Sequence, residues 1–219
     1  MNTICFKKLL WLSSLSLGFG ALLSACGSVD QYREHLNTSL TGKQIVTQTC
    51  SACHGMDGNS VSPQFPKLSG QQKDYLLAQL EDFKGHQRTD ATGVQYMWGL
   101  SRLTPTQATE VAEYFSKQSP MQGKGVVASA NARGEEIFKN GLLDKGVPAC
   151  SACHGANAEG NGQIPRLSGQ HVNYMVKQIE IFQKTEQRPR GVAMKQITHD
   201  LSDTDIKAVA EYIGNMTAK

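Results

Sequence analysis

The chain has 219 residues, and its 22 Lys and Arg against 19 Asp and Glu give a formal net charge of +3. This small excess excludes nucleic-acid binding driven by a bulk positive charge. With 39% hydrophobic and 19% charged residues, the composition predicts a packed core and excludes a disordered chain.

The first predicted element is an export signal over residues 1–25. Lys7 and Lys8 precede an uncharged, Leu-rich run, which is typical of a signal peptide. The run ends in a stretch that resembles the bacterial lipoprotein box, whose cysteine carries a diacylglyceryl group: Leu23-Ser24-Ala25-Cys26-Gly27. We therefore predict lipidation at Cys26. The alternatives are an ordinary cleaved signal or an uncleaved anchor of about 20 apolar residues, and all three export the protein.

A polar tether over residues 26–40 is predicted to follow the signal. Gly27 stands where the inner-membrane retention signal of enterobacteria has an Asp, so an outer-membrane anchor is slightly favoured. We expect a lipid-anchored protein on the periplasmic side of a bacterial membrane, and a soluble periplasmic protein is the second choice.

The rest of the chain is an internal repeat whose offset drifts only from 100 to 97 residues. A repeat of this length predicts two small homologous domains. We place them at 41–118 and 132–219, joined by a linker over 119–131. The matching features are the stretches 50–55 and 150–155, the stretches 66–71 and 165–170, and the pairs Tyr75/Tyr174, Gln79/Gln178, Phe83/Phe182 and Met97/Met194.

Helices are predicted throughout both units. One begins near Gly42 or Gly134 and leads to each cysteine cluster, and another covers residues 72–84 and the matching segment of the second unit. The last begins at an N-cap, Thr104 or Ser202, and runs to about residue 116 or 216. No convincing strands are present, so the predicted fold class is all-α. Such thin helical domains need a large apolar group at their centre.

Each unit contains a C-x-x-C-H motif. Two cysteines three residues apart on a helical turn can form thioethers to both vinyl groups of a haem, and the next histidine then lies under the iron. A zinc site would close over a shorter separation than that between the two motifs, and a redox dithiol would need a βαβ context. We therefore predict two covalent haem c groups, attached at Cys50, Cys53, Cys150 and Cys153, with His54 and His154 as axial ligands.

Met97 and Met194 are the predicted second axial ligands, because they match each other in polar loops where a core methionine is less expected. The other methionines are too close to a motif, lie in the linker or match no methionine. No histidine outside the motifs has a counterpart in the other unit, and His171 is the strongest competitor among them. His/Met ligation raises the reduction potential relative to bis-His.

Pro66 and Pro165 follow the two motifs at matching positions. Their backbone carbonyls could accept a hydrogen bond from Nδ1–H of the ligand imidazole and fix its orientation. The alternative is that both residues only form turns.

Together these features resemble the di-haem cytochrome c4 family. The resemblance covers about residues 40 to 217 and rests on both C-S-A-C-H-G motifs, both Pro-x-Leu-Ser-Gly-Gln stretches, Met97 and Met194, and residues 146–149 before the second cysteine pair. It implies a tandem pair of class I cytochrome c domains related by a pseudo-two-fold axis, with the haems facing the domain interface. The lipoprotein box departs from the soluble members of this family.

The predicted function is electron transport without catalysis or a small-molecule substrate. The resemblance implies partners such as a quinol-oxidising cytochrome bc complex and a terminal oxidase or periplasmic reductase, and the anchor adds a membrane. The alternative is an electron-accepting subunit of a periplasmic dehydrogenase. A di-haem peroxidase or thiosulfate dehydrogenase is less favoured, because the latter uses a cysteine at one distal site and no spare cysteine follows Cys26.

Overall fold

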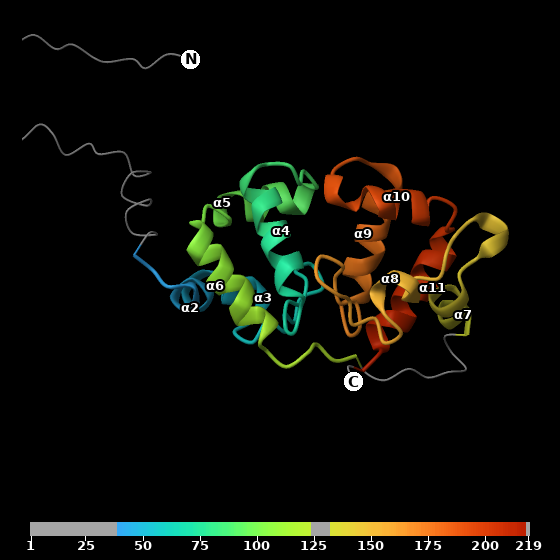
Figure 1. Ribbon diagram of the computed structural model, residues 1–219, viewed down its shortest axis with the longest axis horizontal. Coiled ribbons are helices and arrows are strands. Elements are labelled where there is room, and N and C mark those ends of the chain that lie inside the picture. Colours follow the sequence, from blue (N-terminus) through green and yellow to red (C-terminus); the bar gives the residue numbers. More distant parts are fainter. Residues whose placement is uncertain (1–38, 124–131, 218–219) are drawn as a thin grey trace, which may run out of the picture. The chain divides into compact units, whose positions relative to one another are not determined.

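The computed structural model describes residues 39–123 and 132–217, which we call the first half and the second half (Figure 1). The predicted signal peptide, Cys26 and nearly all of the tether lie outside the described residues. So does most of the linker. No helix within the described ranges is long and apolar enough to cross a membrane.

The first half begins with a continuous helical stretch that carries the first C-x-x-C-H motif at its end. The motif occupies its last turn, because Gly55 then adopts a φ of 79° and ends the helix. The helical elements in chain order are α2 (Gly42–Ile45), η1 (Val46–Cys50), α3 (Ser51–His54), α4 (Lys73–Lys84), η2 (Gly93–Met97), α5 (Trp98–Leu100) and α6 (Pro105–Ser116).

The second half repeats this order with one change before its motif, where a short hairpin separates the first helix from the cysteines. The bridge between Leu142 and Val147 closes this hairpin. The elements are α7 (Ala132–Asn140), η4 (Leu143–Lys145), α8 (Ser151–His154), α9 (Val172–Lys184), η5 (Pro189–Gly191), α10 (Val192–Thr198) and α11 (Asp203–Asn215).

The predicted all-α class is confirmed, because the described residues form helices, turns and two isolated bridges but no strand. Both predicted N-caps are also confirmed. The side chain of Thr104 accepts a hydrogen bond from the backbone N–H of Gln107, and the side chain of Ser202 accepts one from Asp205. Each pair forms a capping box, so the start of the last helix of each half is fixed by local sequence.

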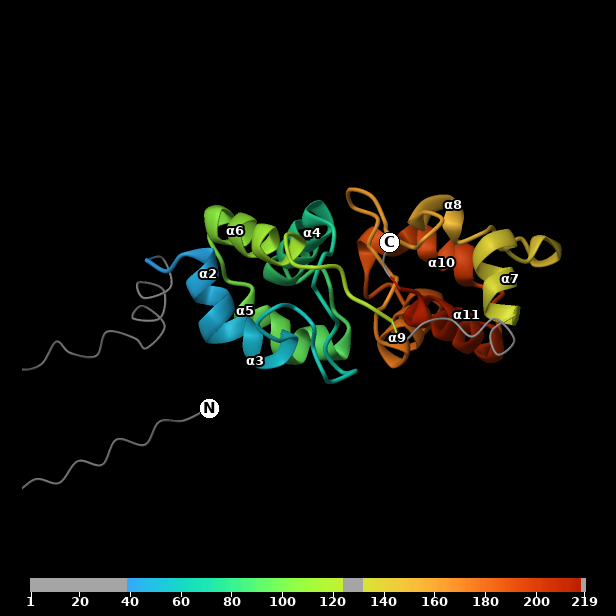
Figure 2. The ribbon, with the colours of Figure 1, turned by 90° about the horizontal axis from the view of Figure 1, so that it is seen from below.

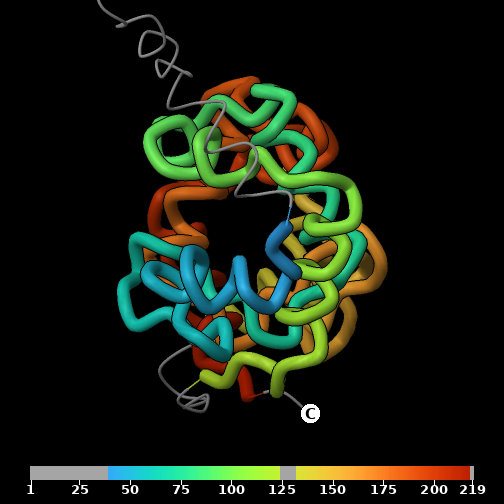
Figure 3. Tube along the Cα trace, turned by 90° about the vertical axis from the view of Figure 1, so that its left-hand side faces the viewer, coloured from blue at the N-terminus to red at the C-terminus, as the bar shows by residue number. Residues whose placement is uncertain are grey.

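A glycine allows the first and last helices of each half to cross at close range. α2 lies beside α6 in the first half (Figure 3), and α7 lies beside α11 in the second (Figure 2). A Cβ atom on Gly42 would lie 2.3 Å from Cβ of Glu110, and one on Gly134 would lie 2.2 Å from the carbonyl oxygen of Ala208. Only glycine permits this approach.

Each half has its own apolar core around this crossing. In the first half Val46, Ala112 and Phe115 are almost completely buried, and in the second half Ile137 and Phe138 are. These core residues lie on the inward faces of the crossed helices, so the crossing gives each half a fixed frame. The motif helices α3 and α8 are held on that frame.

The beginning of the predicted linker is packed rather than extended from the surface. Met121 is fully buried, and its backbone N–H donates to the carbonyl oxygen of Ser69 at 3.2 Å. Gly123 N–H donates to the carbonyl oxygen of Met216 at 3.0 Å. Residues 119–123 therefore contact both halves, which the polar composition of this segment does not indicate.

Candidate functional site

One cavity of about 550 Å³ joins the two motifs. This volume lies within the usual range of sites for small molecules and cofactors. Its lining is mostly apolar and comes from both halves. It includes all of the predicted attachment and axial residues: Cys50, Cys53, His54, Met97, Cys150, Cys153, His154 and Met194.

The two motif histidines have the same environment. His54 is 7% exposed and His154 is 8% exposed. Burial lowers the pKa of each imidazole, and the hydrogen bond to a carbonyl partly opposes that effect. Both rings are therefore neutral at pH 7.

Each imidazole is oriented by the proline that the sequence singled out. Nδ1 of His54 lies 2.8 Å from the carbonyl oxygen of Pro66, and Nδ1 of His154 lies 3.0 Å from that of Pro165. A carbonyl oxygen can only accept, so Nδ1 carries the proton in both rings and Nε2 keeps its lone pair. This is the tautomer that can bind a metal through Nε2.

Cys50 and Cys150 do not have the lowered pKa of a redox-active cysteine. Burial raises the pKa of the Cys50 and Cys150 thiols to about 11, whereas reactive cysteines have a lowered pKa. No group of three or more His, Cys, Asp or Glu side chains in the described ranges is arranged to hold a metal ion.

The expectation that Met97 and Met194 lie in polar loops is wrong. Met97 ends the helical turn η2, and Met194 lies inside α10. The backbone N–H of Ser101 donates to the carbonyl of Met97, and the hydroxyl of Thr198 donates to that of Met194. Both methionines are partly buried and line the cavity on helices other than those of the histidines.

The other described histidines have partners outside the cavity. Nε2 of His171 lies 2.9 Å from both the hydroxyl and the carbonyl oxygen of Ser60 in the first half. His86 stacks on Trp98 with ring centroids 4.1 Å apart, and His199 contacts Asp200. None of the three lines the cavity. His35 lies outside the described residues.

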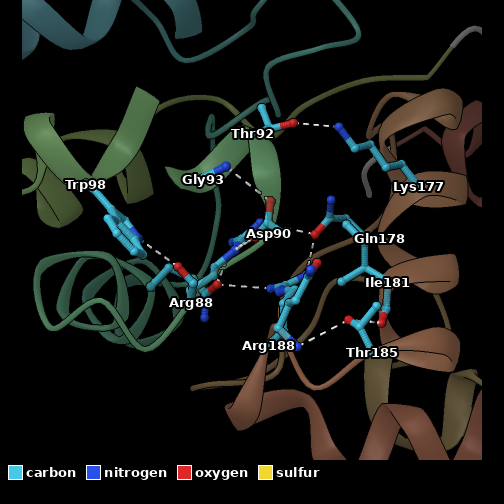
Figure 4. A network of polar contacts seen from close by, with 12 residues as sticks. Arg88, Asp90, Thr92, Gly93, Trp98, Lys177, Gln178, Ile181, Thr185 and Arg188 are labelled. Atoms are coloured by element: carbon cyan, nitrogen blue, oxygen red, sulfur yellow. Dashed lines mark hydrogen bonds and ion pairs between the residues drawn. The ribbon is translucent and has the colours of Figure 1, made fainter. Parts of the chain in front are cut away.

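A buried polar network, not expected from the sequence, also lines the cavity (Figure 4). Arg88 is buried, and its Nε donates to Oδ1 of Asp90 at 2.6 Å. Its carbonyl accepts from Nε1 of Trp98 at 2.8 Å, and Oδ2 of Asp90 accepts from the backbone N–H of Gly93 at 3.2 Å. Arg88 and Asp90 thus hold both ends of the segment that contains Met97.

Arg188 is the counterpart of Arg88 in the second half. Arg88 lies over the ring of Phe83 at 4.6 Å, and Arg188 lies over that of Phe182 at 4.5 Å. Phe83 and Phe182 are a matched pair of the repeat, but each arginine follows at a different distance, five and six residues on. Arg88 and Arg188 are 100 residues apart, whereas the phenylalanines are 99 apart, so the arginine pair departs from the falling offset of the repeat.

The comparisons with known proteins agree with this geometry. The family model for cytochrome c matches twice, at residues 39–119 and 131–217. Cytochrome c4 from Azotobacter vinelandii is 37% identical over 209 residues, which cover 91% of this chain and 94% of that protein. The crystal structure of reduced recombinant cytochrome c4 from Pseudomonas stutzeri matches with a TM-score of 0.71 and 36% identity, covering 80% of this chain and 96% of that one.

A second group of relatives has a different description. A protein of Thiomonas intermedia strain K12 described as a thiosulfate dehydrogenase electron acceptor is 34% identical over 173 residues, which cover 75% of this chain and 77% of that protein.

These matches show that the chain binds two covalent haem c groups, one in each half. The residues present fit such a group: each half offers two cysteines on one helical turn, a neutral imidazole with a free Nε2, and an apolar wall.

Proposed function

This chain belongs to the cytochrome c4 family of di-haem electron-transfer proteins, and from that premise we propose that it carries electrons between respiratory complexes on the periplasmic side of a bacterial membrane. A quinol-oxidising cytochrome bc complex would supply the electrons, and a terminal oxidase or reductase would accept them. The observation that carries the proposal is that both motifs and both repeated methionines line the same cavity.

We assign the ligands as the repeat indicates. Cys50 and Cys53 would hold the first haem, with His54 and Met97 as axial ligands. The equivalent residues for the second haem are Cys150, Cys153, His154 and Met194. The carbonyls of Pro66 and Pro165 would orient the two histidines, since each already accepts a hydrogen bond from Nδ1.

This ligand set suits electron transfer and leaves no position for a substrate. A histidine and a methionine of each half would hold the iron in both oxidation states, and the helices that carry these residues would limit reorganisation. The methionine thioether is a soft ligand that favours ferrous iron and so raises the potential. We therefore propose a carrier without enzymatic activity.

The proposed partners can be tested with respiratory membranes of the source bacterium. The oxidised protein should be reduced by quinol in the presence of these membranes, and an inhibitor of the cytochrome bc complex should abolish the reduction. The reduced protein should then be oxidised in a cyanide-sensitive reaction, if its acceptor is a haem-copper oxidase. Reduction that persists at full rate with the inhibitor would contradict the proposed donor.

The second candidate is an electron acceptor of one periplasmic dehydrogenase, which the Thiomonas relative favours. In this case thiosulfate would reduce the protein only when its dehydrogenase is added. Thiosulfate should have no effect on the protein alone, because all cysteines after Cys26 belong to the two motifs. Thiosulfate oxidation by the purified protein would establish the enzyme alternative instead.

A lipid at Cys26 would keep the carrier at a membrane. The Cys26→Ala variant should be released into the soluble periplasmic fraction while its haem spectrum stays unchanged. A fully processed variant that still sediments with membranes would contradict the lipid anchor, and the soluble periplasm remains the alternative location for a protein with a cleaved signal.

A further inference from the structure

The six-residue stretches 66–71 and 165–170 pack against each other across the two halves, although each was found only as a repeated motif. Their contacts are reciprocal. Nζ of Lys67 donates to the carbonyl oxygen of Gly169 at 2.8 Å, and Nε of Arg166 donates to that of Gly70 at 3.1 Å. Each stretch is therefore hydrogen-bonded to the matching stretch of the other half.

A glutamine at the end of each stretch makes the most specific of these contacts. Oε1 of Gln170 accepts from the backbone N–H of Lys67 at 2.9 Å, and Nε2 of Gln170 donates to the carbonyl oxygen of Lys67 at 2.9 Å. Gln71 does the same for Arg166, with distances of 2.7 and 2.9 Å. We call these four hydrogen bonds the glutamine clasp.

The clasp glutamines are rigidly placed. Gln71 is 4% exposed and Gln170 is 5% exposed. Oε1 of each also accepts from the backbone N–H of the next residue, at 2.9 Å for Gln72 and 3.0 Å for His171, immediately before α4 and α9. Buried amide groups with all these partners keep a single orientation.

The clasped residue directly follows the proline that orients a motif histidine. Pro66, whose carbonyl accepts from His54, precedes Lys67, and Pro165, whose carbonyl accepts from His154, precedes Arg166. The amide that links Pro66 to Lys67 contains both the carbonyl bound by His54 and the N–H bound by Gln170. One peptide plane thus connects a histidine in the first half to a glutamine in the second.

We propose that Gln170 and Gln71 are positioning residues for the axial histidine of the opposite half. Gln170 fixes the peptide plane that orients His54, and Gln71 fixes the plane that orients His154. The inference rests on the proposed ligation of iron by these histidines. A well-oriented Nδ1–H···O=C bond raises the basicity of the imidazole, so each haem potential depends on a side chain from the other half.

The test is a redox titration of the full di-haem protein that resolves both haems, with Gln170→Met and Gln71→Met compared with the wild type. Methionine fills a similar volume but forms neither backbone hydrogen bond. We expect Gln170→Met to raise the potential of the first haem and leave the second unchanged, because a weaker imidazole donor stabilises ferric iron less. Gln71→Met should raise only the second. Met97→Ala and Met194→Ala identify which signal belongs to which haem.

Gln72→Met is the matched control. The side chain of Gln72 also joins the halves, because its Nε2 donates to the carbonyl oxygen of Glu159 at 2.8 Å, but it neither lines the cavity nor contacts either proline segment. A role limited to holding the halves together would give the same shifts in this variant, and that result would overturn the proposal. So would a shift of the haem in the substituted half, equal shifts of both haems, or no shift.

Gln170→Asn covers the case in which Gln170→Met does not fold. It keeps a neutral amide but is one methylene shorter, so it cannot hold both the N–H and the carbonyl of Lys67, and the first haem should shift in the same direction by a smaller amount. A wild-type protein without two low-spin His/Met haems would overturn the proposed function itself. If the wild-type protein has two low-spin His/Met haems but no clasp variant shifts the haem of the opposite half, only the role of the clasp would be overturned.

Discussion

Arg88 and Arg188 lie in different halves of the chain, and both guanidinium groups donate to the same two glutamine side chains. Arg88 reaches Oε1 of Gln79 at 2.7 Å and Oε1 of Gln178 at 3.1 Å. Arg188 reaches the same atoms at 3.0 and 2.8 Å. Figure 4 shows both arginines beside Gln178. The two glutamines are a matched pair of the repeat, so the contacts form a nearly symmetric ring.

Asp90 is the carboxylate that balances this ring of two cations, and its loss should be costly. Asp90 is 1% exposed. Burial raises the pKa of its carboxyl, but the charge and hydrogen bond of Arg88 outweigh that effect and hold the pKa below its ordinary value. We expect Asp90→Asn to lower the free energy of unfolding by about 3 kcal/mol, since it leaves a buried guanidinium without its partner.

Urea unfolding followed by circular dichroism measures this loss. Glu113→Gln is the control, because Glu113 pairs with Lys73 at 3.4 Å on the surface, where its side chain is 40% exposed. An exposed pair contributes less than about 1 kcal/mol. Equal effects of the two substitutions would show that Asp90 has no special role.

Met97→Ala and Met194→Ala test the distal ligands. Each substitution should remove the near-infrared absorption band of one Met-ligated ferric haem, because it removes the thioether sulfur. The affected haem should become high spin or take a replacement ligand, and its potential should fall. If both haems keep the band in either variant, that methionine is not a ligand.

Gly134→Ala should destabilise the second half. The new Cβ would lie 2.2 Å from the carbonyl oxygen of Ala208, so α7 and α11 would have to separate. Overpacking of this kind costs about 1–3 kcal/mol, which exceeds the gain in helix propensity. Gly99→Ala is the control, because nothing lies within 4 Å of a Cβ at that position. The midpoints of thermal unfolding of the two variants test this prediction. Equal midpoints would contradict a close crossing of α7 and α11.

Acid should remove the contribution of Asp205 to stability. Burial raises the pKa of this carboxyl, but hydrogen bonds from Arg133 and Ser202 and the charge of Arg133 lower it from an ordinary value of 3.8 to about 2. The stabilisation is therefore complete above the unfolded value and disappears as the pH falls from about 4 to about 2. It is on the order of 1–2 kcal/mol at pH 6.

The pH dependence of the difference between the wild type and Asp205→Asn isolates this group. The difference in unfolding free energy should be largest at pH 6 and should shrink toward pH 2, where the wild-type carboxyl is also becoming protonated. Asp203→Asn removes the same charge from the same helical turn at an exposed position and serves as the control. A difference that stays constant across this range would contradict the assignment.

The sequence predicted what depends on local pattern. The caps at Thr104 and Ser202 are correct because a capping box lies within four residues. The two C-x-x-C-H motifs could be interpreted because their chemistry depends on a fixed spacing along one helical turn. The repeat then allowed both halves to be described from a single pattern.

Features that depend on distant contacts could not be predicted. The segments around Met97 and Met194 contain glycines and polar residues and were expected to be loops. In the structure Gly93 and Gly191 fit against the rings of Phe83 and Phe182, where a Cβ would lie 2.6 and 2.0 Å from the ring. Packing against the preceding helix therefore stabilises short helices that propensity alone would not support.

The contacts between the halves could not be predicted from the sequence either. Gln71 and Gln170 were recognised as part of a repeated motif, but each binds the backbone of a residue about 100 positions away. A repeated motif shows that both copies use the same residues. It does not show that the copies bind each other.

The measurement that tests the central claim most directly is a spectroscopic redox titration of the purified wild-type protein, recorded with the near-infrared band of Met-ligated ferric haem. We expect two low-spin haems, both with this band, that titrate at positive potentials and do not react with peroxide or thiosulfate. A single haem, a high-spin haem or a haem at a strongly negative potential would contradict a di-haem electron carrier with His/Met ligation in both halves.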